Sequence, residues 1–509
     1  MAFLDSAPRV GKRVRIDLPD LFRPAVGEPD AEGVASLRLL IDGEWIPSSS
    51  KDTFDVASPI DGGLIARAPS AQKPDLEAAI GAARRARSSF RSLSATARLR
   101  ICEDAAEILH EDLDHFVAAI VADLGKTPVQ ARSEAGATAE RLELVREEVR
   151  KIFGEYLPGD WIGDAVGKTG IVMREPVGTV AAIGPFNYPL FLAASKIIPA
   201  IAAGNTVVAK APSDDPIALL MFARVLEEAG LPPGVLNVIT GSGAEIGEPL
   251  AAHDDISMIS FTGSSSAGRR IAASAGPKPL HLELGGNAAA IVLADADLEQ
   301  AIDKTLLGAF KNAGQRCDAI SSVLVQQDVY EPFVDKALEQ ARGWTVGDPR
   351  ADGVDVGPLV HARAAAAVNA LVQDAVDKGA ELLLGGEAEA AYHQPTFLAG
   401  VPLEADIVWE ETFGPVMTVL PVADLDEALV IANRSRYGLD SCVFTTSLDN
   451  AWKAARGLEC GQVHVNDAPA HGVGHFPFGG HKPDSGVGRE GLGYSIDECT
   501  VLKTVVMPV

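Results

Sequence analysis

Short apolar runs bounded by turn residues recur through the middle of the chain and alternate with longer stretches of helical periodicity. Continuous apolar runs of this kind are typical of parallel strands that are covered on both faces. Four runs predict buried strands: 178–183, 206–210, 235–240 and 256–261. Helices are predicted from about 190, at 218–230, within 243–252, and after a turn within 262–276. This β-α-β order predicts a doubly wound sheet.

A second group of alternating elements follows Glu283. It comprises predicted helices at 298–312, 330–342, 362–379 and 425–434, and predicted strands at 321–326 and 416–420. We therefore expect a second α/β domain, which agrees with a chain of 509 residues being too long for one compact core. Residues 1–35 are rich in proline and weakly patterned, and we expect them to form a loose arm.

One stretch, 178–210, is apolar enough to resemble a membrane span. We reject that interpretation because glycine, proline and lysine residues interrupt it: Gly184, Pro185, Pro189, Lys196 and Pro199. Residues 1–20 mix charged and apolar side chains, so we expect no secretory signal. We therefore expect no membrane partner.

Net charge and cysteine usage narrow the expected partners and cellular setting of the protein. The formal net charge of −26 repels nucleic acid and acidic membrane surfaces, so we expect neither as a partner. The 5 cysteines are scattered and form no C-x-x-C motif. Free thiols in a reducing, cytoplasmic setting are the simplest interpretation.

Cys317 is a candidate nucleophile because charged residues, Arg316 and Asp318, flank it on both sides. A nucleophilic thiol needs a donor for the oxyanion that it creates and often a base for the second half-reaction. Asn187, in a proline-bounded loop, and Glu283, which precedes a Gly-Gly turn, could fill these roles. Each residue also has an ordinary structural explanation: a thiol that fills space, an asparagine that caps a turn, and a solvated or ion-paired glutamate.

Five motifs change that balance when they are taken together. They are FNYP (186–189), FTGS (261–264), LELGGN (282–287), GQRC (314–317) and EETFGP (410–415). Their order and spacing resemble the aldehyde dehydrogenase superfamily, and the resemblance spans about residues 38–507. It implies a fold of two doubly wound α/β domains, one for the cofactor and one for catalysis, with a small β oligomerisation arm.

The resemblance implies a role for each catalytic candidate. Cys317 is expected to attack the aldehyde carbon, and the Asn187 amide with the Cys317 backbone N–H to hold the oxyanion. Glu283 is expected to activate water for hydrolysis of the thioester, which favours release of a free acid. A non-catalytic structural or binding protein of the same fold remains the alternative class, although all three residues are present.

The cofactor is expected to be NADP, with NAD as the alternative. The resemblance implies that Lys210 holds the adenosine ribose, that Glu411 binds the nicotinamide ribose and that Phe186 and Phe413 lie beside the cofactor. Gly263 and Ser264 lie at a strand-to-helix turn that could bind the pyrophosphate. Where NAD-preferring members often carry glutamate, this chain has Ser213, which favours NADP. Asp214 and Asp215 weaken that argument, and all three residues could instead cap the next helix.

The substrate is expected to be a small polar or anionic aldehyde. FNYP, GQRC, APAHGVGHFPF (468–478) and YSID (494–497) resemble the non-phosphorylating glyceraldehyde-3-phosphate dehydrogenases. Arg316 and Tyr188 match two of their phosphate-binding positions, whereas Ala137 and His471 stand where arginines are expected. Glyceraldehyde-3-phosphate is therefore the leading expectation, and a semialdehyde or a neutral aldehyde is the alternative.

Arg316 is expected to be the main anchor of the anionic group, but Asp318 could pair with it and weaken its pull. In the alternative, Arg316 only braces the loop. His471 and His475 are expected in the substrate pocket. Together with His481 they lack the cysteine or carboxylate spacing of a metal site, so no metal is expected.

The resemblance also divides the chain. We expect an N-terminal arm at 1–35, a dinucleotide-binding domain at 36–156 and 176–285, oligomerisation strands at 157–175 and 490–509, and a catalytic domain at 286–489. The alternating tail at 500–509 lacks an obvious local partner. We expect it to dock on another subunit's sheet, giving a homodimer or homotetramer.

Overall fold

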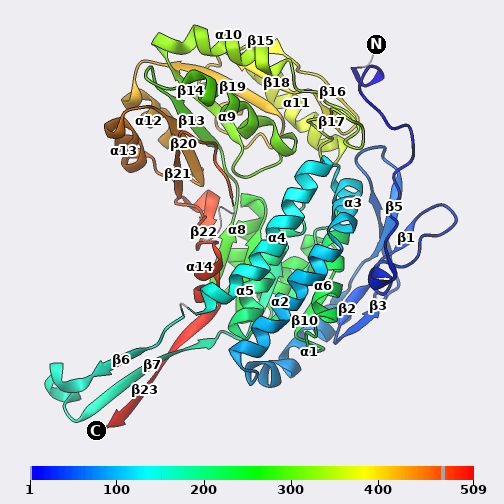
Figure 1. The fold of residues 1–509 in the computed structure, drawn as a ribbon, viewed down its shortest axis with the longest axis vertical. Coiled ribbons are helices and arrows are strands. Elements are labelled where there is room, and N and C mark those ends of the chain that lie inside the picture. The colour runs from blue at the N-terminus through cyan, green and yellow to red at the C-terminus, as the bar shows by residue number, and fades with distance from the viewer. Residues whose placement is uncertain (1–2, 151, 472–475) are drawn as a thin grey trace.

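The computed structural model describes residues 3–150, 152–471 and 476–509, which form two large sheets and a slender projecting arm (Figure 1). The first sheet has eight strands. In spatial order they are β22 (Gly486–Val487), β12 (Leu280–Glu283), β11 (Met258–Thr262), β8 (Thr179–Ile183), β9 (Thr206–Lys210), β10 (Leu236–Ile239), β2 (Leu39–Ile41) and β3 (Glu44–Ile46). The five strands from β12 to β10 are parallel, as their apolar runs predict.

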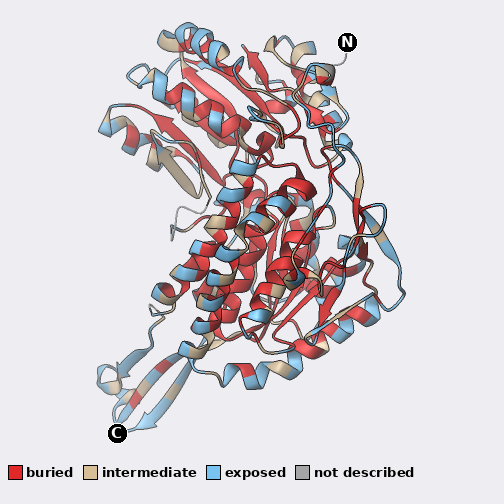
Figure 2. Ribbon diagram, turned by 45° about the vertical axis from the view of Figure 1, so that its right-hand side comes forward, coloured by how far each residue is buried: buried red, intermediate tan, exposed pale blue. Residues whose placement is uncertain are grey.

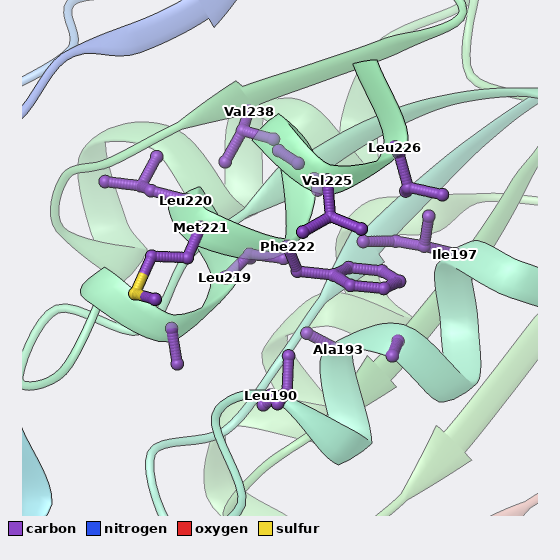
Figure 3. Packing of buried hydrophobic residues seen from close by; sticks show 14 of the residues in the cluster. Leu190, Ala193, Ile197, Leu219, Leu220, Met221, Phe222, Val225, Leu226 and Val238 are labelled. Atoms are coloured by element: carbon purple, nitrogen blue, oxygen red, sulfur yellow. The ribbon is translucent and has the colours of Figure 1, made fainter. Parts of the chain in front are cut away.

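Helices cover both faces of this sheet. They are α1 (Lys73–Arg91), α2 (Ala95–Glu111), α3 (Leu113–Leu124), α4 (Pro128–Val149), α5 (Phe191–Ala203), α6 (Ile217–Glu228), α7 (Glu248–Ala252) and α8 (Ser265–Ala275). One face packs against α5 and α6, with α2 to α4 outside them, and the other against α1, α7 and α8. Phe222 of α6 lies among apolar side chains of α5 and β10 (Figure 3). The sheet and its inner helices are consequently almost entirely buried (Figure 2).

The second sheet has seven strands. In order they are β15 (Glu381–Leu384), β18 (Thr396–Ala399), β19 (Val416–Val422), β14 (Ile320–Gln326), β13 (Ala288–Val292), β20 (Asp440–Phe444) and β21 (Gln462–Val465). All pair in parallel except β15 with β18. Its helices are α9 (Leu298–Phe310), α10 (Tyr330–Ala341), α11 (Ala362–Asp377), α12 (Leu425–Arg434) and α13 (Leu448–Gly457). The prediction of two doubly wound α/β units with an additional β arm is confirmed.

The arm is a three-stranded antiparallel sheet that projects from the body (Figure 1). It consists of β6 (Glu155–Pro158), β7 (Lys168–Pro176) and β23 (Thr500–Pro508), and α14 (Leu492–Glu498) leads into it. β23 pairs with β7 from Thr500↔Pro176 to Pro508↔Lys168. The tail therefore pairs within its own chain, although its partner strand is not local in the sequence. The chain folds back on itself after more than 300 residues, a pairing that no local pattern encodes.

The expectation of a loose N-terminal arm is also wrong. Val14, Ile16, Leu18 and Phe22 are buried in the helical core of the first sheet, and the Phe22 ring packs edge-on against Phe116. A small sheet of β1 (Ala35–Ser36), β5 (Leu64–Pro69) and β4 (Thr53–Ala57) follows. A hairpin of β16 (Ala388–Glu389) and β17 (Tyr392–His393) lies near the N-terminus. Apolar residues spaced two apart along an extended segment carry this packing, although the segment is not a paired strand.

No helix in the described ranges is long and apolar enough to cross a membrane. The apolar stretch at 178–210 divides into β8, α5 and β9, as predicted. The predicted helix at 298–312 ends earlier, at Phe310. It ends there because Asn312, Ala313 and Gly314 all adopt positive φ angles of 57°, 54° and 71°. This turn connects α9 to the loop that carries Cys317.

Candidate active site

Two cavities meet at the thiol of Cys317. The larger has a volume of about 440 Å³ and lies along the carboxyl ends of β8, β9 and β11. The smaller has a volume of about 110 Å³ and lies between α4, α5 and the loop before β14. Asn187, Thr262 and Cys317 line both. Ligands of doubly wound sheets bind at the carboxyl ends of the strands, so this position is the one that the topology favours.

The backbone around Cys317 is packed too tightly for side chains. A Cβ atom on Gly286 would lie 1.9 Å from the Cys317 carbonyl oxygen, and one on Gly314 would lie 2.0 Å from the Gly414 carbonyl oxygen. Burial raises the pKa of the Cys317 thiol well above its ordinary value, and the carboxyl groups of Asp318 and Asp440 add to the effect. The resting group is therefore a thiol, and its activation requires a proton acceptor.

Asn187 lies beside the loop that carries Cys317. Its Nδ2 donates a hydrogen bond of 2.9 Å to the Gln315 carbonyl oxygen, which leaves the second amide N–H for another acceptor. Asn312 Nδ2 lies 3.3 Å from the Asn187 carbonyl oxygen and fixes the two loops together. The arrangement supplies a rigid donor at the junction of the two cavities.

Glu283 ends β12 and lines the smaller cavity. Neither carboxyl oxygen has a hydrogen-bond partner in the described part of the chain. Burial raises the pKa of Glu283 well above its ordinary value, Glu490 raises it further, and Lys196 opposes the rise. A carboxyl group that takes up protons this readily, aimed into a cavity beside a thiol, is suited to act as a general base.

The larger cavity contains most of the residues predicted to hold the cofactor. Its walls include Phe186, Lys210, Gly263, Ser264, Glu411 and Phe413. Ser264 also caps α8, whose amino terminus faces this cavity and favours a phosphate group there. Burial raises the pKa of Glu411 to about 7, against the opposing effect of its hydrogen bond from the Gly286 N–H. The helix terminus and the lysine fit a dinucleotide.

Ser213 does not line this cavity. Its hydroxyl donates to the Gly241 carbonyl oxygen at 3.0 Å, and the residue lies in a separate groove beneath the N-terminal segment. Asp214 lines the cavity in its place. The structure therefore does not bring Ser213 together with the other predicted cofactor residues.

The whole of residues 45–505 matches the model of the aldehyde dehydrogenase family. The chain belongs to this family. It is 38% identical over 92% of its length to the NADP-dependent glyceraldehyde-3-phosphate dehydrogenase of Streptococcus equinus, covering 98% of that protein. It is 37% identical, again over 92%, to a 3-sulfolactaldehyde dehydrogenase of Priestia aryabhattai, covering 97% of it.

A solved structure of an aldehyde dehydrogenase has the same fold as this chain. The NADP-dependent glyceraldehyde-3-phosphate dehydrogenase of Bacillus halodurans C-125, complexed with NADP, superimposes with a TM-score of 0.90 at 36% identity. The match covers 92% of this chain and 99% of that one. The resemblance read from the five motifs is thereby confirmed at the level of the family.

Arg316 precedes the cysteine and is held by the surrounding loops. Its Nε donates to Asp318 Oδ1 at 2.8 Å, and its Nη2 donates to the Pro469 carbonyl oxygen at 3.0 Å. Asp318 Oδ2 accepts from the His471 N–H at 2.9 Å. Burial alone would raise the pKa of Asp318, but Arg316 lowers it below its ordinary value. The predicted pairing of Arg316 with Asp318 is confirmed.

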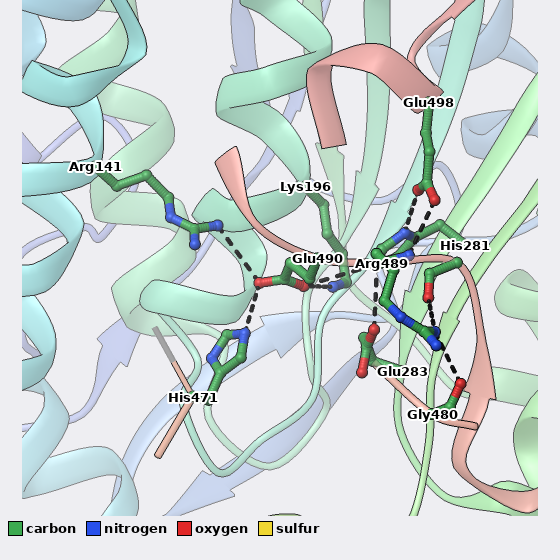
Figure 4. A network of polar contacts seen from close by, with 10 residues as sticks. Arg141, Lys196, His281, Glu283, His471, Gly480, Arg489, Glu490 and Glu498 are labelled. Carbon is green, nitrogen blue, oxygen red and sulfur yellow. Dashed lines mark hydrogen bonds and ion pairs between the residues drawn. The ribbon is translucent and has the colours of Figure 1, made fainter. Parts of the chain in front are cut away.

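Several buried charges near the cavity were missed by the sequence analysis. Glu490 lies 3.1 Å from His471, 3.2 Å from Lys196 and 3.4 Å from Arg141 (Figure 4). Burial would raise the pKa of Glu490, but these cations hold it well below its ordinary value. Lys196 could have been found, because it is a single charge in an otherwise apolar helix.

Tyr188 and Lys311 complete the smaller cavity. The ammonium group of Lys126 lies 3.4 Å from the centre of the Tyr188 ring and 2.6 Å from Glu134. Lys311 also lines the cavity, and its ammonium group makes no ion pair or hydrogen bond within the described residues. Lys311 lies six residues before Cys317 and outside the GQRC motif, so no motif in the sequence indicated a role for it.

The histidines do not form a shared cluster. His471 packs between the rings of Phe191 and Phe478 in the wall of the smaller cavity, whereas His481 is exposed. His475 lies outside the described residues. In the ranges that the structure describes, no three histidine, cysteine or carboxyl side chains gather as a metal site would require.

Proposed function

We propose that this aldehyde dehydrogenase oxidises a short aldehyde with a terminal anionic group to the carboxylic acid, with NADP as the electron acceptor. The observation that carries the proposal is the position of Cys317 at the junction of the two cavities. An aldehyde in the smaller cavity would meet the thiol on one side and the nicotinamide in the larger cavity on the other. The chemistry then divides into acylation and deacylation of Cys317.

In the acylation half, Cys317 loses its proton to Glu283 and attacks the aldehyde carbon to give a thiohemiacetal. The free amide N–H of Asn187 and the Cys317 backbone N–H stabilise the oxyanion, each donor being worth about 3 kcal/mol. A bound NADP would supply the hydride acceptor for this half, and Cys317 would then carry the product as a thioester. Lys210, Glu411 and the α8 terminus would hold the cofactor in place for this step.

Glu283 first releases to solvent the proton that it took from Cys317. In the deacylation half, the Glu283 carboxylate then takes a proton from a water molecule that attacks the thioester carbon. The tetrahedral adduct then expels Cys317 as the acid is released. Because neither Glu283 oxygen has a hydrogen-bond partner in the described structure, the carboxylate can accept a hydrogen bond from that water. Release of a free acid follows from this arrangement.

The preference for NADP is supported by the relatives named above, two of which are described as NADP-dependent. Lys210 and Arg270 line the cavity and could attract a 2′-phosphate. Asp214, which lines the same wall, opposes this preference, so NAD is the alternative to be measured.

The charge balance of the smaller cavity supports an anionic substrate. Arg316 is paired with Asp318 and Lys126 with Glu134, which leaves Lys311 as the lysine or arginine without an ion pair among the described lining residues. Glyceraldehyde-3-phosphate is our leading candidate, and 3-sulfolactaldehyde, the substrate named for a relative at 37% identity, is the second.

The test is a panel of aldehydes with both cofactors: glyceraldehyde-3-phosphate, 3-sulfolactaldehyde, lactaldehyde, succinic semialdehyde and propanal. We expect kcat/KM for an anionic three-carbon aldehyde with NADP to exceed that for propanal by about 10²-fold. Equal values for propanal and the anionic aldehydes would contradict the substrate class. No turnover of any aldehyde would instead favour a non-catalytic protein of this fold.

We also propose a homodimer or homotetramer formed through the three-stranded arm, and a reducing, cytoplasmic setting in which the five thiols stay free. The first sheet would form the dinucleotide-binding domain (36–156 and 176–285) and the second the catalytic domain (286–489). Exposed apolar side chains on β23 support the assembly, because such an edge is open to pairing with another chain.

A further inference from the structure

Glu283 has a histidine on the same face of its strand. Side chains alternate along a strand, so His281 and Glu283 of β12 point in one direction and Leu282 in the other. His281 Nε2 lies 3.6 Å from Glu283 Oε1 and has no hydrogen-bond partner among the described residues. Its Nδ1 lies 2.5 Å from Glu498 Oε2 (Figure 4).

The three groups differ in their access to solvent. The side chains of His281 and Glu283 are 3% and 4% exposed, whereas that of Glu498 on α14 is 29% exposed. A base that takes a proton from water at every turnover must return it to bulk solvent. Of these three side chains, that of Glu498 is the one in contact with bulk solvent.

We propose that His281 and Glu498 form the exit path for the proton that Glu283 collects during deacylation. Glu283 passes its proton to Nε2 of His281, the proton on Nδ1 moves to the Glu498 carboxylate, and Glu498 releases it to bulk water. No bond other than N–H and O–H bonds changes. A half-turn of the imidazole about its Cβ–Cγ bond restores the starting tautomer.

The local structure supports this path. A Cβ atom on Gly488 would lie 2.9 Å from His281 Nδ1 and 3.0 Å from Glu498 Oε1, so the glycine leaves room for the pair. The charged groups that face His281 are Glu283, Glu490, Glu498, Lys196 and Arg489. The Arg489 side chain is held by the carbonyl oxygens of Gly480 and Gly488.

Glu490 is the competing proton acceptor, and its surroundings argue against it. It lies 3.9 Å from His281 Nε2, but Lys196, His471 and Arg141 hold its pKa well below the ordinary range. Its side chain is also 1% exposed, so a proton placed there would have no exit. In the path through His281 to Glu498, His281 accepts the proton and the partly exposed Glu498 releases it to solvent.

This inference rests on the proposed roles of Cys317 and Glu283, and the test separates the two. Hydrolysis of 4-nitrophenyl acetate by the enzyme without cofactor forms an acetyl-enzyme on Cys317 with no hydride transfer. The burst of 4-nitrophenolate reports acylation, and the steady rate reports deacylation. The variants are His281→Phe, Glu498→Gln and their combination. The control is Glu77→Gln, a glutamate that pairs with His253 far from the site.

In both single variants we expect an unchanged burst and a steady rate that is lowered about 10-fold. The double variant should be no slower than either single variant, because the two substitutions interrupt the same proton path. The solvent deuterium isotope effect on the steady rate should rise, because proton departure becomes limiting. An unchanged steady rate in Glu498→Gln, or an equal fall in burst and steady rate, would overturn the relay. An absent burst in the unmodified enzyme would overturn the role of Cys317, and the relay with it.

Discussion

Arg316 and Asp318 form a buried ion pair across Cys317, with Arg316 Nε 2.8 Å from Asp318 Oδ1. The two side chains are only 6% and 7% exposed, so neither is readily available to solvent. A further bond from Arg316 to the Pro469 carbonyl oxygen uses a second donor. The guanidinium group therefore braces the loop first, and only its remaining N–H groups can reach a substrate. This shifts the expected anchor of an anionic aldehyde towards Lys311.

Lys311→Met should lower kcat/KM for glyceraldehyde-3-phosphate by about 10- to 10²-fold, because a direct charge contact in a small cavity is lost. The value for propanal should change less than about twofold. Exposed Lys336 on α10 provides the matched control, Lys336→Met. Equal losses for both aldehydes would assign Lys311 a structural role. Arg316→Ala is a poorer test, since it leaves Asp318 buried and unpaired.

Cys317→Ser should lower turnover by at least about 10³-fold, because a serine hydroxyl is a far weaker nucleophile than a thiolate. Cofactor binding, followed by fluorescence quenching, should be retained. Cys460→Ser is the control, because that half-buried thiol lies outside both cavities and its bond to the Gln462 carbonyl oxygen can be kept by a hydroxyl. Near-normal turnover in Cys317→Ser would refute the assignment.

Glu283→Gln should slow the steady rate by about 10²-fold or more, since deacylation then lacks its base. The raised pKa of Glu283 implies that the active carboxylate accumulates only as the pH rises above the ordinary carboxyl range. The steady rate of the unmodified enzyme should therefore climb with pH, and that of the variant should not. Rapid-mixing kinetics at several pH values measure this. A variant with a parallel pH profile would contradict the role.

A stability test addresses Asp440, whose two carboxyl oxygens are buried without hydrogen-bond partners among the described residues. Burial raises the pKa of Asp440 well above its ordinary value, and Asp318 adds to the effect. Above the ordinary aspartate range the unfolded chain ionises while the folded protein retains the proton. Stability is therefore lost as pH rises through that window.

Asp440→Asn should remove this loss and stabilise the protein by about 1 kcal/mol at pH 8, with a smaller gain at pH 5. Thermal unfolding at both pH values measures the difference. The control substitution Asp352→Asn, at an exposed position, should change the stability at neither pH value. A gain that is equal at pH 5 and pH 8 would show that ionisation of Asp440 is not its cause.

The assembly prediction concerns the edge strand β23. Light scattering should give two or four times the chain mass of 53.2 kDa at micromolar concentration. Leu502 and Val506 are each 63% exposed on that strand, and Leu502→Lys with Val506→Lys should shift the mass towards the single chain. Val430→Lys, at an equally exposed position on α12, is the control. A monomer in the unmodified protein would contradict the prediction.

The two sheets and the family could both be predicted from the amino-acid sequence. Apolar runs such as 178–183 and 206–210 became β8 and β9 because burial on both faces leaves a local pattern that tertiary contacts do not need to supply. The motifs around Glu283 and Cys317 identified the family because their residue types and spacing are specific. The pairing of Arg316 with Asp318 was also accessible, since the two residues are adjacent to the same cysteine.

The contacts between distant segments could be seen only in the folded structure. Val14 and Phe22 proved to be buried, and the tail β23 found β7, because each contact joins residues far apart in the chain. Ser213 turned towards Gly241 and away from the larger cavity, which its position after Lys210 could not reveal. The contact between His281 and Glu498 could not be predicted for the same reason. An ion pair requires two backbone segments to lie close together in space, and the order of residues does not specify that distance.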